Sequence, residues 1–260
     1  MSRHASPSRT RDKLPRKEFP VIETRNEVRG LAQVRSLLRR IAVRRFCPPE
    51  VLAAMQRWAE AEKTKREQDD RNRARVEAVL RSGEPVLLEL GAGARRLKGW
   101  TTIDRGGDSD LCLDLSLPLP LPDACIDGIY SSHVLEHFAF PEPLCGLLAE
   151  CHRILKPKAF FSTAVPNARP YLEGYFRPQG FDPEMRCLYR PAYHYHSAID
   201  YVNYIAYMDG HHRYMFDEGN LTAILTEAGF EDVRLREFDP SLDLEERRNE
   251  SIYASCRKPG

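Results

Sequence analysis

Residues 86–104 read VLLELGAGARRLKGWTTID, and the fold class can be inferred from their pattern. Residues 86–88 are an apolar run short enough for a buried strand. Gly91 and Gly93 flank an alanine directly after it, and such glycines let the backbone turn sharply and approach a ligand. A second short strand then ends at Asp104. An acidic side chain at a strand tip beside a glycine turn is placed to bind a ribose.

The spacing of this stretch argues against a dinucleotide site. Only 11 residues separate Gly93 from Asp104, whereas the dinucleotide fingerprint places its acid about 20 residues on. The third glycine of that fingerprint is also absent, because arginines follow Ala94. An NAD-dependent oxidoreductase is therefore disfavoured. Glu89 lies in an otherwise apolar strand, where an unpaired charge is costly, so we expect it to have a partner.

Several motifs in order resemble one known family, the class I S-adenosylmethionine-dependent methyltransferases, in its small-molecule and glycan subgroup with a short glycine loop. They are LLELGAGARRLKGWTTID, then DLSLPLPLPDACIDGIYSSHVLEHF, ECHRILKP and AVPN. The resemblance covers residues 84–258. It implies an α/β fold: a Rossmann-like sheet of seven mostly parallel strands with an antiparallel last strand. The family usually has two glycines after its Lys-Pro pair, where this chain has Lys158 and Ala159.

The resemblance also implies the cofactor, S-adenosylmethionine, and most of its site. Asp104 would hold the ribose, and the glycine loop would face the methionine part. A strand-end acid and its neighbour would lie beside the adenine, although Asp114 could equally be a plain strand-end carboxylate. The implied cofactor-binding residues are Glu89, Gly91, Ala92, Gly93, Asp104, Asp114, Leu115 and Ser131.

Methyl transfer from a sulfonium depends chiefly on positioning, and a general base helps when the acceptor is a hydroxyl. His133 is the leading candidate because it follows a strand end and its pKa lies near neutrality. It could instead only shape the cofactor pocket. His194, His196, His211 and His212 are reserves. The Asn/Asp-Pro-Pro-aromatic motif of nucleic-acid amino-methylating enzymes is absent, which disfavours nucleobase amines. The family members that the chain resembles commonly act on small molecules or sugars, and this resemblance implies a hydroxyl of such a molecule as the acceptor.

The spacing of apolar residues and the positions of proline and glycine predict the remaining helices and strands. A helix is expected to begin at residues 134–137 and continue over 143–155. A second one, capped by Asp217, should stop at Gly229. Further strands are expected at residues 126–130, 159–164, 233–237 and 252–256.

Two domains are expected. Residues 1–82 form a basic, partly disordered and helical extension, with an amphipathic stripe over residues 31–41 and a long helix over 50–81. Residues 83–258 form the methyltransferase domain. Its insertion at about 168–215 is rich in tyrosine and histidine, which suits a substrate lid or a surface subdomain packed by tyrosines. No metal is expected there, since nothing completes a site at His194 and His196.

Charge is divided unevenly along the chain. Residues 1–81 hold 21 Lys and Arg against 11 Asp and Glu, and the remainder holds 18 against 27. Docking of the basic helix on the protein itself is favoured over an anionic membrane surface. One alternative function is an RNA-binding methyltransferase whose arm grips phosphates. Another is a catalytically silent scaffold. Scattered cysteines and the lack of a signal peptide or membrane span favour the cytoplasm.

Overall fold

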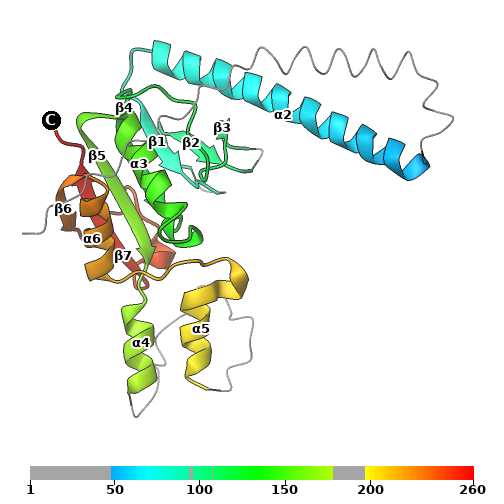
Figure 1. The fold of residues 1–260 in the computed structure, drawn as a ribbon. Helices are drawn as coiled ribbons and strands as arrows, with labels where there is room; N and C mark the ends of the chain where they lie inside the picture. Colours follow the sequence, from blue (N-terminus) through cyan, green and yellow to red (C-terminus); the bar gives the residue numbers. More distant parts are fainter. Residues whose placement is uncertain (1–47, 94–95, 107, 178–196) are drawn as a thin grey trace, which may run out of the picture. The chain divides into compact units, whose positions relative to one another are not determined.

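The computed structural model describes residues 48–93, 96–106, 108–177 and 197–260 (Figure 1). The chain divides into two compact units, Met1–Glu62 and Lys63–Gly260. The expected long helix is confirmed as α2, Pro49–Arg81. It runs through the unit boundary. The assignment of residues 1–82 and 83–258 to separate domains stays a prediction.

One sheet of seven strands forms the centre of the second unit, in the order β3-β2-β1-β4-β5-β7-β6. The strands β1 to β5 pair in parallel, and β7 is antiparallel to both β5 and β6. The expected sheet is therefore confirmed. The strand order reverses between β1 and β4, and the crevice at such a switch point is where open α/β sheets bind ligands. The bounds are β1 Leu87–Leu90, β2 Thr101–Asp104, β3 Leu111–Cys112, β4 Ile126–Ser132, β5 Leu155–Pro166, β6 Glu231–Leu235 and β7 Ser251–Arg257.

The apolar side chains of the central strands are buried, because helices and loops cover the sheet and leave these strands little contact with solvent. Leu90, Ile103 and Ile129 are fully buried, as parallel strands inside α/β proteins usually are. Two helices pack near the sheet, α3 (Leu144–Ile154) and α6 (Glu218–Glu227) (Figure 1). Asp217 caps α6 as expected: its side chain accepts from the Asn220 N–H at 2.8 Å.

Four expected boundaries were wrong. The strand expected at residues 233–237 is β6, which spans Glu231–Leu235. The helix expected over residues 134–155 is two elements, the 3₁₀ turn η2 (Leu135–His137) and α3, because Phe138 takes an extended conformation between them. The fourth strand continues to Ser132 rather than ending at Tyr130. The fifth begins at Leu155, with a register irregularity against β4 that accommodates the following Lys-Pro pair.

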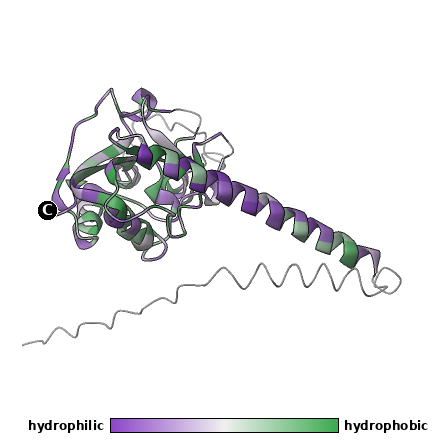
Figure 2. Cartoon of the chain, turned by 90° about the horizontal axis from the view of Figure 1, so that it is seen from above, coloured by the Kyte–Doolittle hydropathy of each residue, from purple (hydrophilic) through white to green (hydrophobic). Residues whose placement is uncertain are grey.

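The C-terminal half of α2 belongs to the second unit. Val76 is buried in the main core, and Arg75 forms an ion pair with Asp110 at 2.7 Å. Asn72 is also buried; its amide donates to Cys112 O at 2.8 Å and accepts from the Cys112 N–H at 3.1 Å. The middle of α2 is hydrophilic, as Figure 2 shows.

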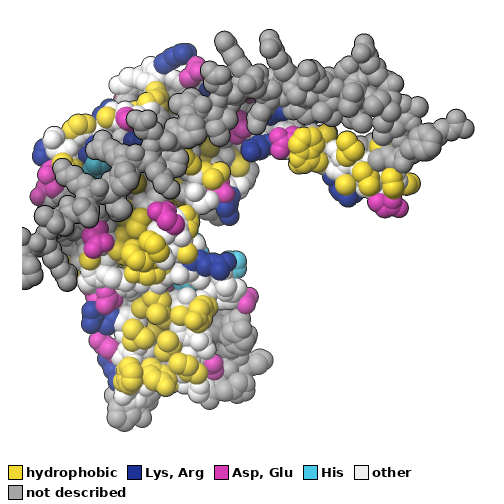
Figure 3. Space-filling model, in the orientation of Figure 1, with side chains coloured by type: hydrophobic (Ala, Val, Ile, Leu, Met, Phe, Trp, Pro, Cys, Tyr) yellow, Lys and Arg dark blue, Asp and Glu magenta, His cyan; other side chains and the backbone are white. Residues whose placement is uncertain are grey.

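The insertion contains two short helices, α4 (Arg169–Phe176) and α5 (Ile199–Tyr207), followed by the 3₁₀ turn η3 (Met208–Gly210). A small second core lies here, in which the rings of Tyr171 and Tyr204 are 5.8 Å apart. The tyrosine packing is confirmed for this described part. Apolar side chains also gather on the surface of this region (Figure 3). None of the helices in the described ranges is both long and apolar enough to cross a membrane.

Candidate active site

The glycine loop after β1 is held against the turn after β4. Gly91 has a φ of +62°, and its N–H donates to Ile103 O at 2.7 Å. A Cβ at Gly91 would lie 2.5 Å from Val134 Cγ2, so only glycine fits. Gly93 also has a positive φ, of +57°, but, its chain neighbours aside, no heavy atom of the described residues lies within 4 Å of the position of its Cβ. The loop is therefore closely packed at its first glycine and open at its second.

Asp104 ties this loop to the tip of β2. Its Oδ2 accepts from the Gly93 N–H at 2.9 Å, and its Oδ1 accepts from the Gly106 N–H at 3.1 Å. The residue is half-buried. A carboxylate offers about four acceptor positions, so further hydrogen bonds can be accepted on its exposed side.

Glu89 has the partner that its position in an apolar strand requires. It is only 6% exposed, and its Oε2 accepts from the Leu97 N–H at 2.8 Å. The bond fixes the chain that leaves the glycine loop. Ala92, between the two glycines, is half-buried.

The two residues expected beside the adenine differ in their surroundings. The Asp114 carboxylate accepts from Ser116 Oγ at 2.6 Å and from Arg105 Nη2 at 2.5 Å. The Ser116 hydrogen bond, followed by the Arg105 guanidinium, lowers the pKa of Asp114 to about 2. Leu115 is buried in the core.

Ser131 lies in the middle of the sheet rather than after a strand. Its side chain is fully buried, and its Oγ shares a hydrogen bond of 2.8 Å with Thr163 Oγ1 on β5. The hydroxyl thus links two strands.

His133 begins the turn after β4. Its φ is +54°, which is unusual for a residue other than glycine, and its N–H donates to Ala164 O at 2.8 Å. The side chain is 9% exposed, and its Nε2 lies 2.8 Å from Ser251 Oγ. Burial, and after it the positive charge of Arg247, hold the pKa of His133 well below its usual value. The imidazole is therefore neutral at pH 7.

Glu136 is the polar group with the most unusual surroundings. It is 1% exposed, and within the described residues neither carboxyl oxygen has a hydrogen-bond partner. Its Oε1 lies 3.7 Å from His133 Nδ1 and 3.9 Å from His137 Nε2. Burial raises the pKa of Glu136 to about 8, so the carboxyl is protonated at pH 7. An unsatisfied buried polar group costs about 1–3 kcal/mol.

Two further side chains lie near this group, His212 beside the His137 ring and Arg247 near the Glu136 carboxyl. His212 is 4% exposed, its Nδ1–H donates to Ile205 O at 2.8 Å, and its ring centroid is 5.5 Å from that of His137. Burial lowers the pKa of His212. Arg247, in the 3₁₀ turn η4 (Glu245–Arg247), donates through Nη1 to Ser132 O and Oγ, both at 3.3 Å.

A comparison with protein families gives the decisive match. The family described as "Methyltransferase domain" matches residues 33–235. The chain belongs to this family. It is an S-adenosylmethionine-dependent methyltransferase. Among curated proteins, no sequence matches the chain.

Solved structures similar to the methyltransferase are distant. An S-adenosylmethionine-dependent methyltransferase from Mesorhizobium loti is 20% identical, with 69% of this chain and 96% of that chain covered and a TM-score of 0.37. One from Archaeoglobus fulgidus is 17% identical, with 72% and 91% covered and a TM-score of 0.39. A possible exported protein from Bordetella parapertussis is 15% identical, with 74% and 68% covered and a TM-score of 0.44. Family membership rests on the family match, not on these neighbours.

The geometry of the methyltransferase suits its methyl donor. The open space at Gly93 adjoins the exposed side of the Asp104 carboxylate, and both lie at the switch point of the sheet. The turn that begins at His133 contacts this loop through Val134. The structure thus brings together Glu89, the loop, Asp104 and the backbone of His133. The cofactor and catalytic roles of the expected residues stay predictions.

Sequence reasoning missed part of this arrangement. It assigned no catalytic role to Glu136 or His137, and it singled out neither Arg247 nor Ser251. No local pattern marks the last two, since they approach β4 only when β7 pairs with β5. Of the reserve histidines, His212 joins the cluster and the His211 carbonyl contacts His137. The other two, His194 and His196, lie outside the described residues.

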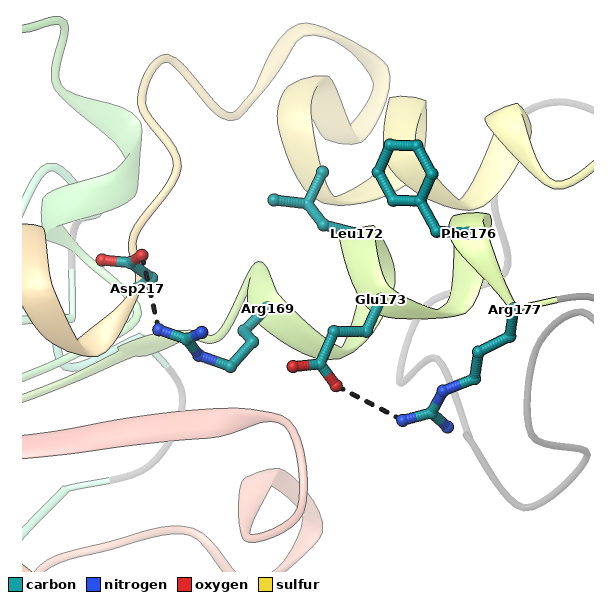
Figure 4. A pocket seen from close by; sticks show the side chains of 6 residues that line it. All are labelled: Arg169, Leu172, Glu173, Phe176, Arg177 and Asp217. Carbon is teal, nitrogen blue, oxygen red and sulfur yellow. Dashed lines mark hydrogen bonds and ion pairs between the residues drawn. The ribbon is translucent and has the colours of Figure 1, made fainter.

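A groove lies beside α4. Leu172 and Phe176 lie on one side of the helix, while the charged side chains lie on the other (Figure 4). Those charges are paired, since Arg169 lies 3.6 Å from Asp217 and Arg177 lies 3.3 Å from Glu173. The groove offers apolar contact rather than acid–base chemistry.

Proposed function

We propose that this methyltransferase transfers a methyl group to a hydroxyl of a small molecule or a sugar. Bound S-adenosylmethionine supplies a methyl group already activated by its sulfonium. The main support is the neutral, buried imidazole of His133. The turn that begins at His133 packs against the glycine loop. A hydroxyl must lose its proton when it is methylated, and a neutral imidazole can accept that proton.

The proposed donor site contains the residues expected from the sequence. Asp104 would bind the ribose hydroxyls, which suits its half-exposed carboxylate. Gly91, Ala92 and Gly93 would face the methionine part, with Glu89 holding their loop in place. Asp114 and Leu115 would lie beside the adenine. Ser131 would act through its strand position, because its hydroxyl is bonded to β5.

The insertion is proposed to contact the acceptor. The groove beside α4 supports this, because it combines apolar surface from Leu172 and Phe176 with paired charges at its margin. Such a surface favours an organic molecule over a nucleic acid, whose phosphates need unpaired cations. A cytoplasmic location is part of the same proposal.

Transfer of labelled methyl groups tests the acceptor class. Purified protein is incubated with methyl-labelled S-adenosylmethionine and cell extract separated into small molecules, glycans and RNA. We expect label in a small-molecule or glycan product, with the methyl carbon on oxygen by NMR. Label in RNA, or on nitrogen or carbon, would overturn the proposal.

Two variants connect the result to the site. Asp104→Ala should abolish S-adenosylmethionine binding by calorimetry. His133→Gln should keep that binding and lose roughly 10²-fold in kcat, at the lower end of general-base effects. Full activity of His133→Gln would exclude it as the base.

A further inference from the structure

A buried imidazole with a lowered pKa is a poor isolated base, because it does not readily keep the proton that it accepts. If His133 keeps a proton, it becomes a cation inside the protein, where charge is strongly disfavoured. Arg247 adds repulsion, because its guanidinium lies near His133. The proton therefore needs a path onward, and the neighbours of His133 provide one.

We propose that Glu136 connects His133 to His137 as a proton-release chain. The inference rests on the proposed function, because the chain would remove the proton that a hydroxyl acceptor loses on methylation. Three observations support it: the position of Glu136 Oε1 between two imidazoles, the absence of any hydrogen-bond partner for that carboxyl within the described residues, and the exposure of His137.

The hydrogen bonds at the two ends fix the direction of the chain. His137 Nδ1 lies 3.0 Å from His211 O, a carbonyl that can only accept, so the proton of the neutral ring is on Nδ1. Its Nε2 therefore accepts, and this nitrogen faces Glu136. The His137 side chain is 43% exposed, so the proton can pass from it to water.

At the inner end, Ser251 Oγ lies 2.8 Å from His133 Nε2. Both residues are partly exposed, but the His133 side chain is only 9% exposed and its Nε2 faces Ser251 Oγ, so an acceptor would approach Ser251. An acceptor hydroxyl would donate to Ser251, and Ser251 would donate to His133. Ser251 and His133 are then the catalytic residues, and Glu136 is a positioning residue that acts through His133.

The proton count balances. The acceptor proton enters at Ser251, the Nδ1 proton of His133 passes to Glu136, and the carboxyl proton of Glu136 passes to His137. One proton enters and one leaves, so the buried groups are neutral again; the proton of His133 then lies on Nε2, and its return to Nδ1 completes the cycle. The gaps of 3.7 Å and 3.9 Å must shorten to hydrogen-bond length during this transfer. Long catalytic contacts are common before a substrate binds.

The test uses the full-length protein and needs no acceptor. Infrared spectroscopy follows the protonated carboxyl band between pH 6 and pH 9.5, and side-chain nitrogen NMR follows His137. We expect the band to disappear as pH rises through about 8, with a step in the His137 signal over the same range. Glu136→Gln should remove both the band and the step.

Matched variants separate this chain from a merely structural carboxyl. Glu227→Gln, which removes an exposed carboxyl of α6, should change neither signal. His137→Gln should shift the midpoint of the Glu136 band, because coupled titrations are reciprocal. The His137→Gln variant also tests the coupling between the two groups if Glu136→Gln does not fold. An ionised Glu136 at pH 6, or a His137 signal that shows no step tied to Glu136, would overturn the inference.

Activity provides an independent check after an acceptor has been found. Glu136→Gln and His137→Gln should each lower kcat by about 10²-fold with KM for S-adenosylmethionine unchanged. If the labelled-methyl assay finds transfer to nitrogen or carbon, the proposed function fails, while the coupled titration remains a separate result. If transfer to oxygen is found but both variants keep full kcat, only the chain is refuted.

Discussion

The contact between the glycine loop and the turn after β4 predicts a large loss of stability for Gly91→Ala. An alanine at a φ of +62° costs about 1–2 kcal/mol. Its Cβ would also lie 2.5 Å from Val134 Cγ2, and overpacking of this kind costs about 1–3 kcal/mol. The expected total is therefore about 2–5 kcal/mol, a large part of the roughly 5–15 kcal/mol that stabilises a typical domain.

Gly93→Ala is the matched control. It has nearly the same φ, +57°, but, its chain neighbours aside, no atom of the described residues lies near its Cβ position, so only the strain of about 1–2 kcal/mol should appear. Urea unfolding would measure both free energies. The order should be reversed for S-adenosylmethionine binding by calorimetry, because the Gly93→Ala methyl group enters the open space of the proposed donor site.

A double-mutant cycle isolates the contact itself. Val134→Ala removes the methyl group that Gly91→Ala would strike, so the two substitutions together should cost about 1–3 kcal/mol less than their sum. Equal unfolding free energies for the two glycine variants would refute the packing argument. Strict additivity of Gly91→Ala and Val134→Ala would refute it as well.

Further predictions concern the charged groups. Burial raises the pKa of Glu136 from 4.5 to about 8, so between these pH values the folded state holds a proton that the unfolded state releases. The free energy of unfolding should therefore fall as pH rises from about 4.5 to 8, and Glu136→Gln should reduce this pH dependence in urea unfolding. Arg247→Met should raise the pKa of His133, measured by NMR, since a repelling cation is removed. Asp104→Asn should weaken S-adenosylmethionine binding about tenfold or more in calorimetry, since hydrogen bonds to a charged acceptor contribute about 1.5–3 kcal/mol. Asp243→Ala should cost about 3–5 kcal/mol in thermal unfolding, because this buried carboxylate accepts from a guanidinium at 2.6 Å.

The features that depend on short stretches of chain could be predicted from sequence. The glycine loop, the strand ending at Asp104 and the cap at Asp217 each follow from a few neighbouring residues. The family resemblance extended this to the whole sheet and to the donor. The helix after His133 was predicted too long because its apolar spacing continues past a segment with its own backbone conformation.

The cluster around Glu136 depends on contacts between distant parts of the chain. His133 and Ser251 are separated by 118 positions, and they meet because β7 returns antiparallel beside β5. Sequence alone therefore placed His133 after a strand but gave neither its partner nor its burial. Ser131 shows the same limit, because its bond to Thr163 depends on the register of β4 against β5.

The Asn72 amide has a consequence for the behaviour of the protein in concentrated solution. β3 is the terminal strand of the sheet, with β2 as its one neighbour. An edge strand presents unpaired peptide groups that can recruit a strand from another molecule and start aggregation. The Asn72 amide on α2 binds both the N–H and the C=O of Cys112. These are the two hydrogen bonds that an added strand would make with this residue. The long polar helix thus protects the edge of the sheet against strand addition.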